Sequence, residues 1–110
     1  MLRGPGFLCE FSVERRDTGE RVNEAALEVD SVEAAVRWIR IAVRTALPGF
    51  EGETLRAAGA FLSAGRKTER KLREKQVTTL TLAQGSLTIV WLISPIATGE
   101  RQRICVWPWA

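Results

Sequence analysis

Residues 77–93 read VTTLTLAQGSLTIVWLI, two apolar and β-branched runs joined by Gln84-Gly85-Ser86. Residues of this kind favour strands, and a glycine in the short link between two such runs predicts a β-hairpin. The second run is apolar on both faces apart from Thr88, which is typical of a central strand covered on both sides. This hairpin therefore predicts a sheet in which residues 87–93 lie in the middle.

The amino-terminal part of the chain predicts a second hairpin. Residues 7–14 alternate between apolar and polar, which is the pattern of a half-buried strand. The turn sequence Asp17-Thr18-Gly19 then precedes another alternating run at 25–30. Residues 22–30 also fit helical spacing, so a long helix beginning there is the alternative to the hairpin.

The clearest helix is predicted from Ser31 to about Leu47, where apolar side chains recur on one face at helical spacing. Asp30 followed three residues later by Glu33 is a capping-box pattern, and it favours a helix start here over the longer helix. Pro48-Gly49 ends the helix, because proline cannot continue the hydrogen-bond ladder.

Two further segments complete the element list. Residues 53–64 predict a shorter helix, and the polar run 66–75 after it is either a loop or an exposed helix that follows a break at Gly65. Residues 94–100 are predicted to be a connection, and residues 101–107 alternate and predict a last strand, which Pro108 stops.

The predicted order is therefore β-β-α-α-β-β-β, in which strands are segregated from helices. Such an order favours an α+β fold, here a mostly antiparallel sheet of about five strands packed against one long and one shorter helix. We predict one domain over residues 1–110. A chain of 110 residues that is 45% hydrophobic buries enough surface for a core without disulfide or metal.

The composition excludes several kinds of catalytic site. The chain has no histidine, so Ser-His-Asp and Cys-His catalysis and histidine-based zinc sites are excluded. Cys9 and Cys105 are too few for a thiolate metal cage, and both are predicted to be buried structural thiols. We therefore predict a non-enzymatic protein with no catalytic, cofactor-binding or metal-binding residues.

Membrane insertion and secretion are not indicated by the sequence. No stretch approaches the roughly 18 apolar residues of a membrane span, and the amino terminus has no apolar run of signal-peptide length. A cytoplasmic location with reduced cysteines and no membrane partner is the expectation.

Basic residues are concentrated in two places. Residues 66–75 hold six lysines and arginines against two glutamates, and three more arginines lie opposite the apolar face of the long helix. Clustered positive charge attracts phosphates or acidic proteins, although a merely solvated helix face is the alternative. The predicted basic contact residues are Arg66, Lys67, Arg70, Lys71, Arg73 and Lys75, together with Arg37, Arg40 and Arg44. Whether the two sets share a surface is left open.

Trp107 and Trp109 near the carboxyl terminus are the second candidate contact. They either fold back onto the core or form an apolar patch for a partner or a homodimer, since tryptophan is common at interface hot spots.

The function predicted from these features is a small binding or regulatory protein, such as an inhibitor or immunity-type factor, that acts through a protein–protein interface. The alternative is a nucleic-acid-binding protein that uses the basic residues on backbone phosphates. A second alternative is a small-ligand-binding domain with an apolar pocket between helix and sheet, lined by Trp38 and Trp91.

Overall fold

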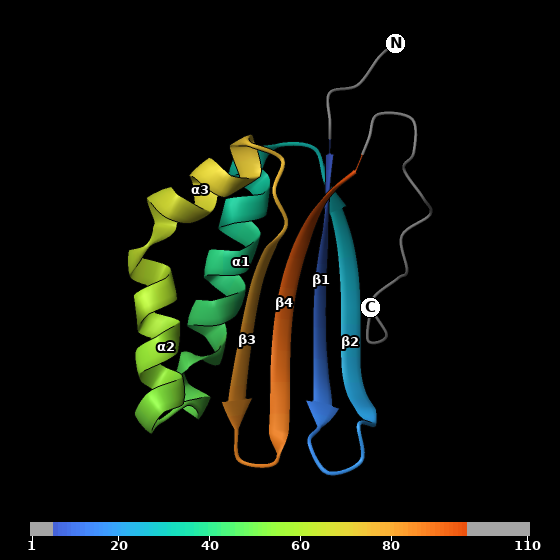
Figure 1. Cartoon of the computed structure of the whole chain (residues 1–110), viewed down its shortest axis with the longest axis vertical. Coiled ribbons are helices and arrows are strands. Elements are labelled where there is room, and N and C mark those ends of the chain that lie inside the picture. Colours follow the sequence, from blue (N-terminus) through green and yellow to red (C-terminus); the bar gives the residue numbers. More distant parts are fainter. Residues whose placement is uncertain (1–5, 97–110) are drawn as a thin grey trace.

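The structure, a computed structural model, describes residues 6–96, and these form a four-stranded antiparallel sheet in the order β2-β1-β4-β3 with three α-helices (Figure 1). The strands pair as β1–β2, β1–β4 and β3–β4, so both hairpins predicted from the sequence are present. The elements, in chain order, are β1 (Gly6–Arg15), β2 (Arg21–Val29), α1 (Val32–Ala46), a 3-10 turn (Leu47–Gly49), α2 (Gly52–Ser63), α3 (Gly65–Arg73), β3 (Thr78–Gln84) and β4 (Leu87–Ile96).

β4 lies between β1 and β3, as its apolar sequence predicts. The turn that joins β3 to β4 contains Gly85 at φ 61°, a left-handed conformation that glycine adopts without a steric penalty. Residues 22–30 form β2 and its end, so the helical alternative for this segment is wrong. The tight turn after β1, with Gly19 at φ 74°, brings β2 back along β1 and makes the strand the better solution.

The two faces of the sheet differ sharply. One face packs against the helices and supplies Cys9, Trp91 and Ile93 to the core, and α1 adds Ile39 and Val43, all at most 1% exposed. The other face carries the alternate residues of each strand, which are half-buried or exposed. The prediction that β4 is covered on both faces is therefore confirmed for one face only. Within residues 6–96, the helices pack on that face and leave the other uncovered.

The helix α1 begins one residue later than the capping-box pattern predicts. The Oγ atom of Ser31 accepts a hydrogen bond from the backbone N–H of Ala34 at 3.0 Å, so Ser31 and not Asp30 is the cap. At its other end the helix passes into a 3-10 turn at Leu47–Gly49, and Phe50 then anchors the chain in the core.

Three parts of the predicted fold need correction. The sheet has four strands within residues 6–96 where about five were predicted, and the fifth, at 101–107, lies outside the described residues. There are three helices where one long and one shorter helix were predicted, because residues 65–73 form α3 as a separate helix. β4 extends to Ile96, into the segment 94–100 that was predicted to be a connection, since Pro95 is accommodated opposite Phe7 in the β1–β4 ladder.

Candidate basic surface on two helices

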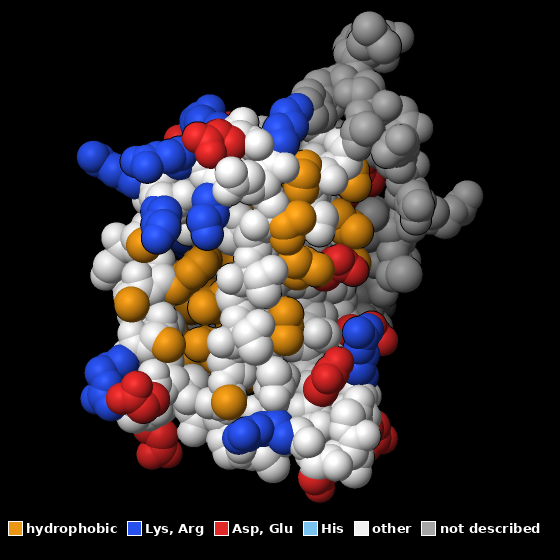
Figure 2. All heavy atoms as spheres, in the orientation of Figure 1, with side chains coloured by type: hydrophobic (Ala, Val, Ile, Leu, Met, Phe, Trp, Pro, Cys, Tyr) orange, Lys and Arg blue, Asp and Glu red, His pale blue; other side chains and the backbone are white. Residues whose placement is uncertain are grey.

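The helix α3 buries only two side chains, Thr68 and Leu72, and exposes all its lysines and arginines. With 100° between successive residues, Arg66, Arg70 and Arg73 lie opposite the buried pair. Lys67 and Lys71 lie on one flank and Glu69 on the other. In Figure 2 the basic side chains gather over α3, at the upper left of the molecule.

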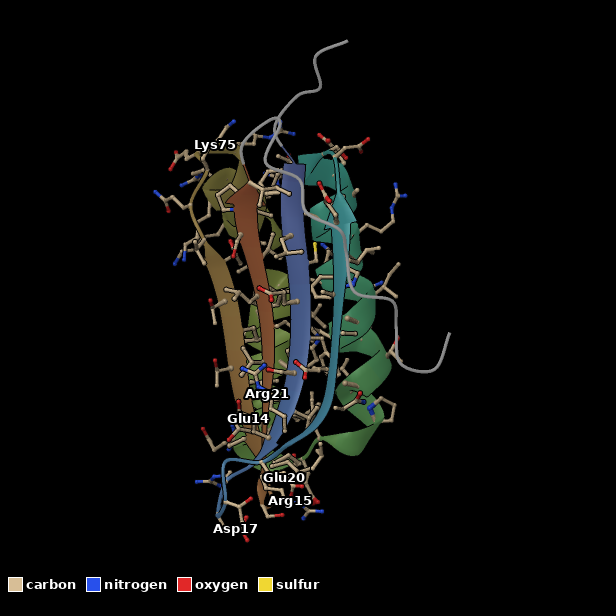
Figure 3. The ribbon with its side chains drawn as sticks, turned by 90° about the vertical axis from the view of Figure 1, so that its right-hand side faces the viewer. Glu14, Arg15, Asp17, Glu20, Arg21 and Lys75 are labelled. Atoms are coloured by element: carbon tan, nitrogen blue, oxygen red, sulfur yellow. The ribbon has the colours of Figure 1, made fainter. Side chains whose placement is uncertain are left out.

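Lys75 follows the end of α3 in a left-handed conformation, with φ 61°. Its N–H donates to the carbonyl of Leu72 at 3.0 Å, and the N–H of Gln76 donates to the carbonyl of Lys71 at 2.9 Å. These two bonds form a Schellman motif, in which glycine is the usual residue at the left-handed position. The motif places the Lys75 side chain at the end of the molecule opposite the β1–β2 turn, which carries Asp17 (Figure 3).

Arg37, Arg40 and Arg44 lie on the face of α1 that turns away from the sheet. Together with part of α3 they surround a shallow depression of about 350 Å³. Its lining residues are Glu33, Val36, Arg37, Arg40, Ile41, Arg44 and Glu69. Because Glu69 belongs to α3 and the other residues to α1, the depression lies where the two helices meet.

Direct contacts join the two basic sets, a point that the sequence leaves open. The Nη1 atom of Arg40 lies 2.7 Å from the position that a Cβ atom would take at Gly65, the first residue of α3. Arg73 of α3 donates from Nη2 to Glu33 of α1 at 2.9 Å and to Glu69 at 2.7 Å. A second depression is lined by Glu69 together with Arg66, Arg70 and Arg73. Because Glu69 lines both depressions, these three arginines of α3 adjoin the three of α1, and we call the six arginines the basic surface.

The ion pairs of the basic surface shift the pKa values of their partners. A hydrogen bond from its own backbone N–H at the start of α1, and then one from Arg73, lower the pKa of Glu33. Hydrogen bonds to Glu69 and then Glu33 raise the pKa of Arg73. All three side chains are well exposed, so salt screens these attractions and each pair adds little to stability. Only the Arg73–Glu33 pair joins α3 to α1, since Glu69 lies on α3 itself.

Two apolar side chains lie among the charged residues of the basic surface. Ile41 is 57% exposed, the largest exposed fraction among the large hydrophobic side chains of residues 6–96, and it lines the depression beside Val36. The sequence places Ile41 close to the arginine stripe, but that position alone gives no reason to single it out as a contact residue. The helix contact that creates the depression depends on α3, the exposed helix that the sequence offers only as an alternative to a loop at residues 66–75.

An apolar cleft lies between α1 and the strands β1 and β4. It has a volume of about 280 Å³ and is lined by Phe11, Trp38, Ala42, Thr45, Ala46 and Trp91. Phe11 and Trp91 pack with ring centroids 5.7 Å apart. The two tryptophans that the sequence suggests for a pocket wall thus lie on one cleft, with Trp91 buried and Trp38 half-buried.

The outer face of the sheet carries an acidic group of side chains on β1 and β2. Arg21 of β2 bonds to Glu14 of β1 at 3.2 Å and to Glu24 at 3.0 Å (Figure 3 labels Glu14 and Arg21). Glu10 lines the same depression of about 440 Å³, beside Val90. The register of β1 and β2, with an irregularity after Val13, brings these carboxylates together, and no local sequence pattern reveals it.

The remaining candidate residues are the two cysteines and the two carboxyl-terminal tryptophans, and the structure describes only Cys9 among them. Cys9 is fully buried, as predicted, and burial raises the pKa of its thiol to about 12, so it is a poor nucleophile at neutral pH. Cys105, Trp107 and Trp109 lie outside the described residues. Across residues 6–96, no three acidic or cysteine side chains converge on a site for a metal ion. None of the described helices combines the length and the apolar character that crossing a membrane requires.

Comparison of the chain with protein-family models, with curated proteins and with solved structures finds no match in any of the three. The functional argument therefore depends on the side chains and their geometry.

Proposed function

We propose that this protein is a binding protein that contacts an acidic, partly apolar surface of a partner protein through the basic surface on α1 and α3. The observation that carries the proposal is Ile41, which is 57% exposed and lines the same depression as Arg37, Arg40 and Arg44. Protein interfaces commonly combine an apolar anchor at the centre with a polar rim that excludes water, and arginine is enriched in them.

Charge supports the same partner chemistry. The basic surface holds six arginines, against Glu33 and Glu69, while Glu10, Glu14 and Glu24 lie on the outer face of the sheet. A surface of one dominant sign steers an oppositely charged partner into contact and repels a like one.

A protein partner is favoured over nucleic acid because two apolar side chains, Val36 and Ile41, line the depression among the charged ones. Phosphate backbones are bound by positive charge alone, and single-stranded bases by aromatic side chains on which they stack. No aromatic side chain lines the depression. Ile41 would gain nothing from a phosphate backbone but would bury apolar area against a leucine or valine of a partner.

The test uses a short labelled peptide of aspartates and glutamates around one leucine, with fluorescence anisotropy as the readout. We expect Arg40→Glu and Ile41→Asp each to weaken binding roughly tenfold or more, about 1.4 kcal/mol, and Arg40→Lys to restore most of it. Arg56→Glu is the matched control, because Arg56 is an exposed arginine on α2 outside the basic surface.

A short DNA duplex serves as the competing probe. If the duplex binds with a steep salt dependence and Ile41→Asp leaves that binding unchanged, a nucleic-acid function replaces the proposed one. If Arg56→Glu weakens peptide binding as much as Arg40→Glu does, the attraction is a net-charge effect and the proposed surface is wrong.

A further inference from the structure

The outer face of the sheet carries carboxylates set among apolar side chains. Residues that pair across an antiparallel ladder lie about 5 Å apart, so the strand register fixes which side chains are neighbours. Glu10 lies between Ala26 and Leu92. In the next row of this face, Glu24 and Val90 flank a single serine of β1. This part of the face therefore combines negative charge with apolar area.

Glu14 extends the carboxylate group along β1. It lines the same depression of about 440 Å³ as Glu10 and Glu24, and Arg21 is the only basic residue in that lining. Arg21 bonds to Glu14, which Figure 3 labels beside it, and to Glu24, so Glu10 takes part in neither bond. We call Glu10, Glu14 and Glu24 the acidic face, which holds three carboxylates against one guanidinium.

The acidic face has the partner chemistry that the basic surface requires. Its carboxylates lie beside Val90 and Leu92, whereas the arginines of α1 lie beside Ile41. A contact between the two surfaces would therefore pair opposite charges and bury the exposed Ile41 against apolar side chains. Complementary potentials of this kind also steer two molecules into contact.

The charged rows of the two surfaces also match in length. Arg37 and Arg44 are seven residues apart on α1, a rise of about 10 Å. Glu10 and Glu14 are four residues apart on β1, a distance of about 13 Å. The arginines of α1 can therefore face the carboxylates of β1 along the whole row without bending either element.

The acidic face and the basic surface lie on opposite sides of the molecule. Cys9 of β1 and Ile39 of α1 are both fully buried between the sheet and the helices. Glu10 follows Cys9 and points out of the sheet on the far side, whereas the arginines turn outward from α1. One chain therefore cannot join its own two surfaces, and two copies can join only one pair of surfaces at a time.

We propose that the partner of the basic surface is a second copy of this chain, which binds through its acidic face. This inference rests on the proposed function, since it names the partner of the same surface. Each bound pair leaves one surface of each kind free, so copies associate head to tail and not as a closed dimer. Exposed ion pairs are weak and screened by salt, so we expect a Kd of about 1 mM at low salt and no association at about 0.5 M salt.

The test uses two variants that each reverse one surface and keep the other. Arg37→Glu with Arg40→Glu reverses the basic surface, and Glu10→Lys with Glu24→Lys reverses the acidic face. In sedimentation velocity at millimolar protein and low salt, we expect the unaltered chain to associate and each variant alone to remain monomeric. An equal mixture of the two variants is expected to form a one-to-one dimer that does not grow, because one intact surface of each kind remains.

A matched control separates the surfaces from net charge. Arg16→Glu with Arg56→Glu makes the same change in charge as the basic-surface variant, at exposed positions outside both surfaces. We expect this control to self-associate as the unaltered chain does. If it remains monomeric, the attraction depends on net charge and the proposal is overturned.

Isotope labelling locates the contact and shows whether each variant is folded. When only the basic-surface variant carries ¹⁵N, mixing is expected to shift amides of β1 and β2. When only the acidic-face variant carries ¹⁵N, the shifts are expected in α1 and α3. The proposal is overturned if the mixture stays monomeric or if the shifts lie on other elements.

The acidic leucine-containing peptide distinguishes failure of this inference from failure of the proposed function. The acidic-face variant keeps its basic surface, so we expect it to bind the peptide as the unaltered chain does. If it binds the peptide but not the basic-surface variant, self-association is wrong and the proposed function is retained. If it binds neither, both proposals are overturned.

Discussion

The helices α1 and α3 both direct arginines into the basic surface, but different forces hold them in place. α1 buries Ala35, Ile39 and Val43 completely, and its apolar face is continuous along its length. α3 has one large apolar anchor, Leu72, and depends otherwise on its end cap and on ion pairs to Glu33 and Glu69. The surface therefore has one rigid wall and one that can separate from the core at a lower cost in free energy.

The largest expected effect comes from the rigid wall. Ile39→Ala removes a fully buried side chain from the centre of the core, and such truncations cost about 2–5 kcal/mol. We expect the free energy of unfolding to fall by this amount in a single transition, measured by urea denaturation. A loss below about 1 kcal/mol would show that α1 is not the principal support of the sheet.

Leu72→Ala removes a side chain equally buried but located in the weaker wall. We expect a comparable local loss, about 2–4 kcal/mol at α3, but a smaller change in global stability because α3 can open without unfolding the sheet. Hydrogen exchange should accelerate at the amides of residues 66–75 and remain unchanged in β1 and β4. Equal acceleration throughout the chain would mean that α3 unfolds only with the whole domain.

Lys75→Gly acts on the end of α3 alone. Glycine adopts φ 61° without the steric cost of a side chain, so we expect a gain of about 1 kcal/mol, seen as slower amide exchange over the last turn of α3. Lys75→Ala is the control, since it removes the same charge but keeps the Cβ atom. If both variants stabilise the helix equally, charge repulsion rather than backbone conformation limits α3.

The smallest expected effect concerns the bridge between the two helices. The pKa of Glu33 is lowered in the folded protein, so its contribution to stability is present above the unfolded pKa of about 4.3 and is lost as the pH falls through the folded pKa. We expect acid to loosen α3 from α1 before the sheet unfolds, with faster exchange of the α3 amides. Glu33→Gln should already show the faster exchange at neutral pH and respond less to acid, whereas an unchanged pH response would assign the effect to other carboxylates.

The same contrast explains how far the sequence predicts the molecule. α1 and the two hairpins are predictable because period and turn chemistry agree within short windows, as at Gly85 between two β-rich runs. α3 is harder, since Leu72 alone gives no apolar period and the cap uses lysine where glycine is the usual signal. The basic contact residues are visible as charge, but the position of the α3 arginines beside those of α1 depends on the contact between the two helices, which only tertiary packing produces.

The central claim is that the basic surface around Ile41 is where this protein binds a partner. The most direct measurement is a ¹⁵N NMR titration of the protein with the acidic leucine-containing peptide, which reports on every amide at once. The account predicts shifts confined to residues 33–44 and 65–75, and their loss in Ile41→Asp. Shifts centred on the outer face near Glu14 and Glu24, or no shifts at high peptide concentration, would contradict it.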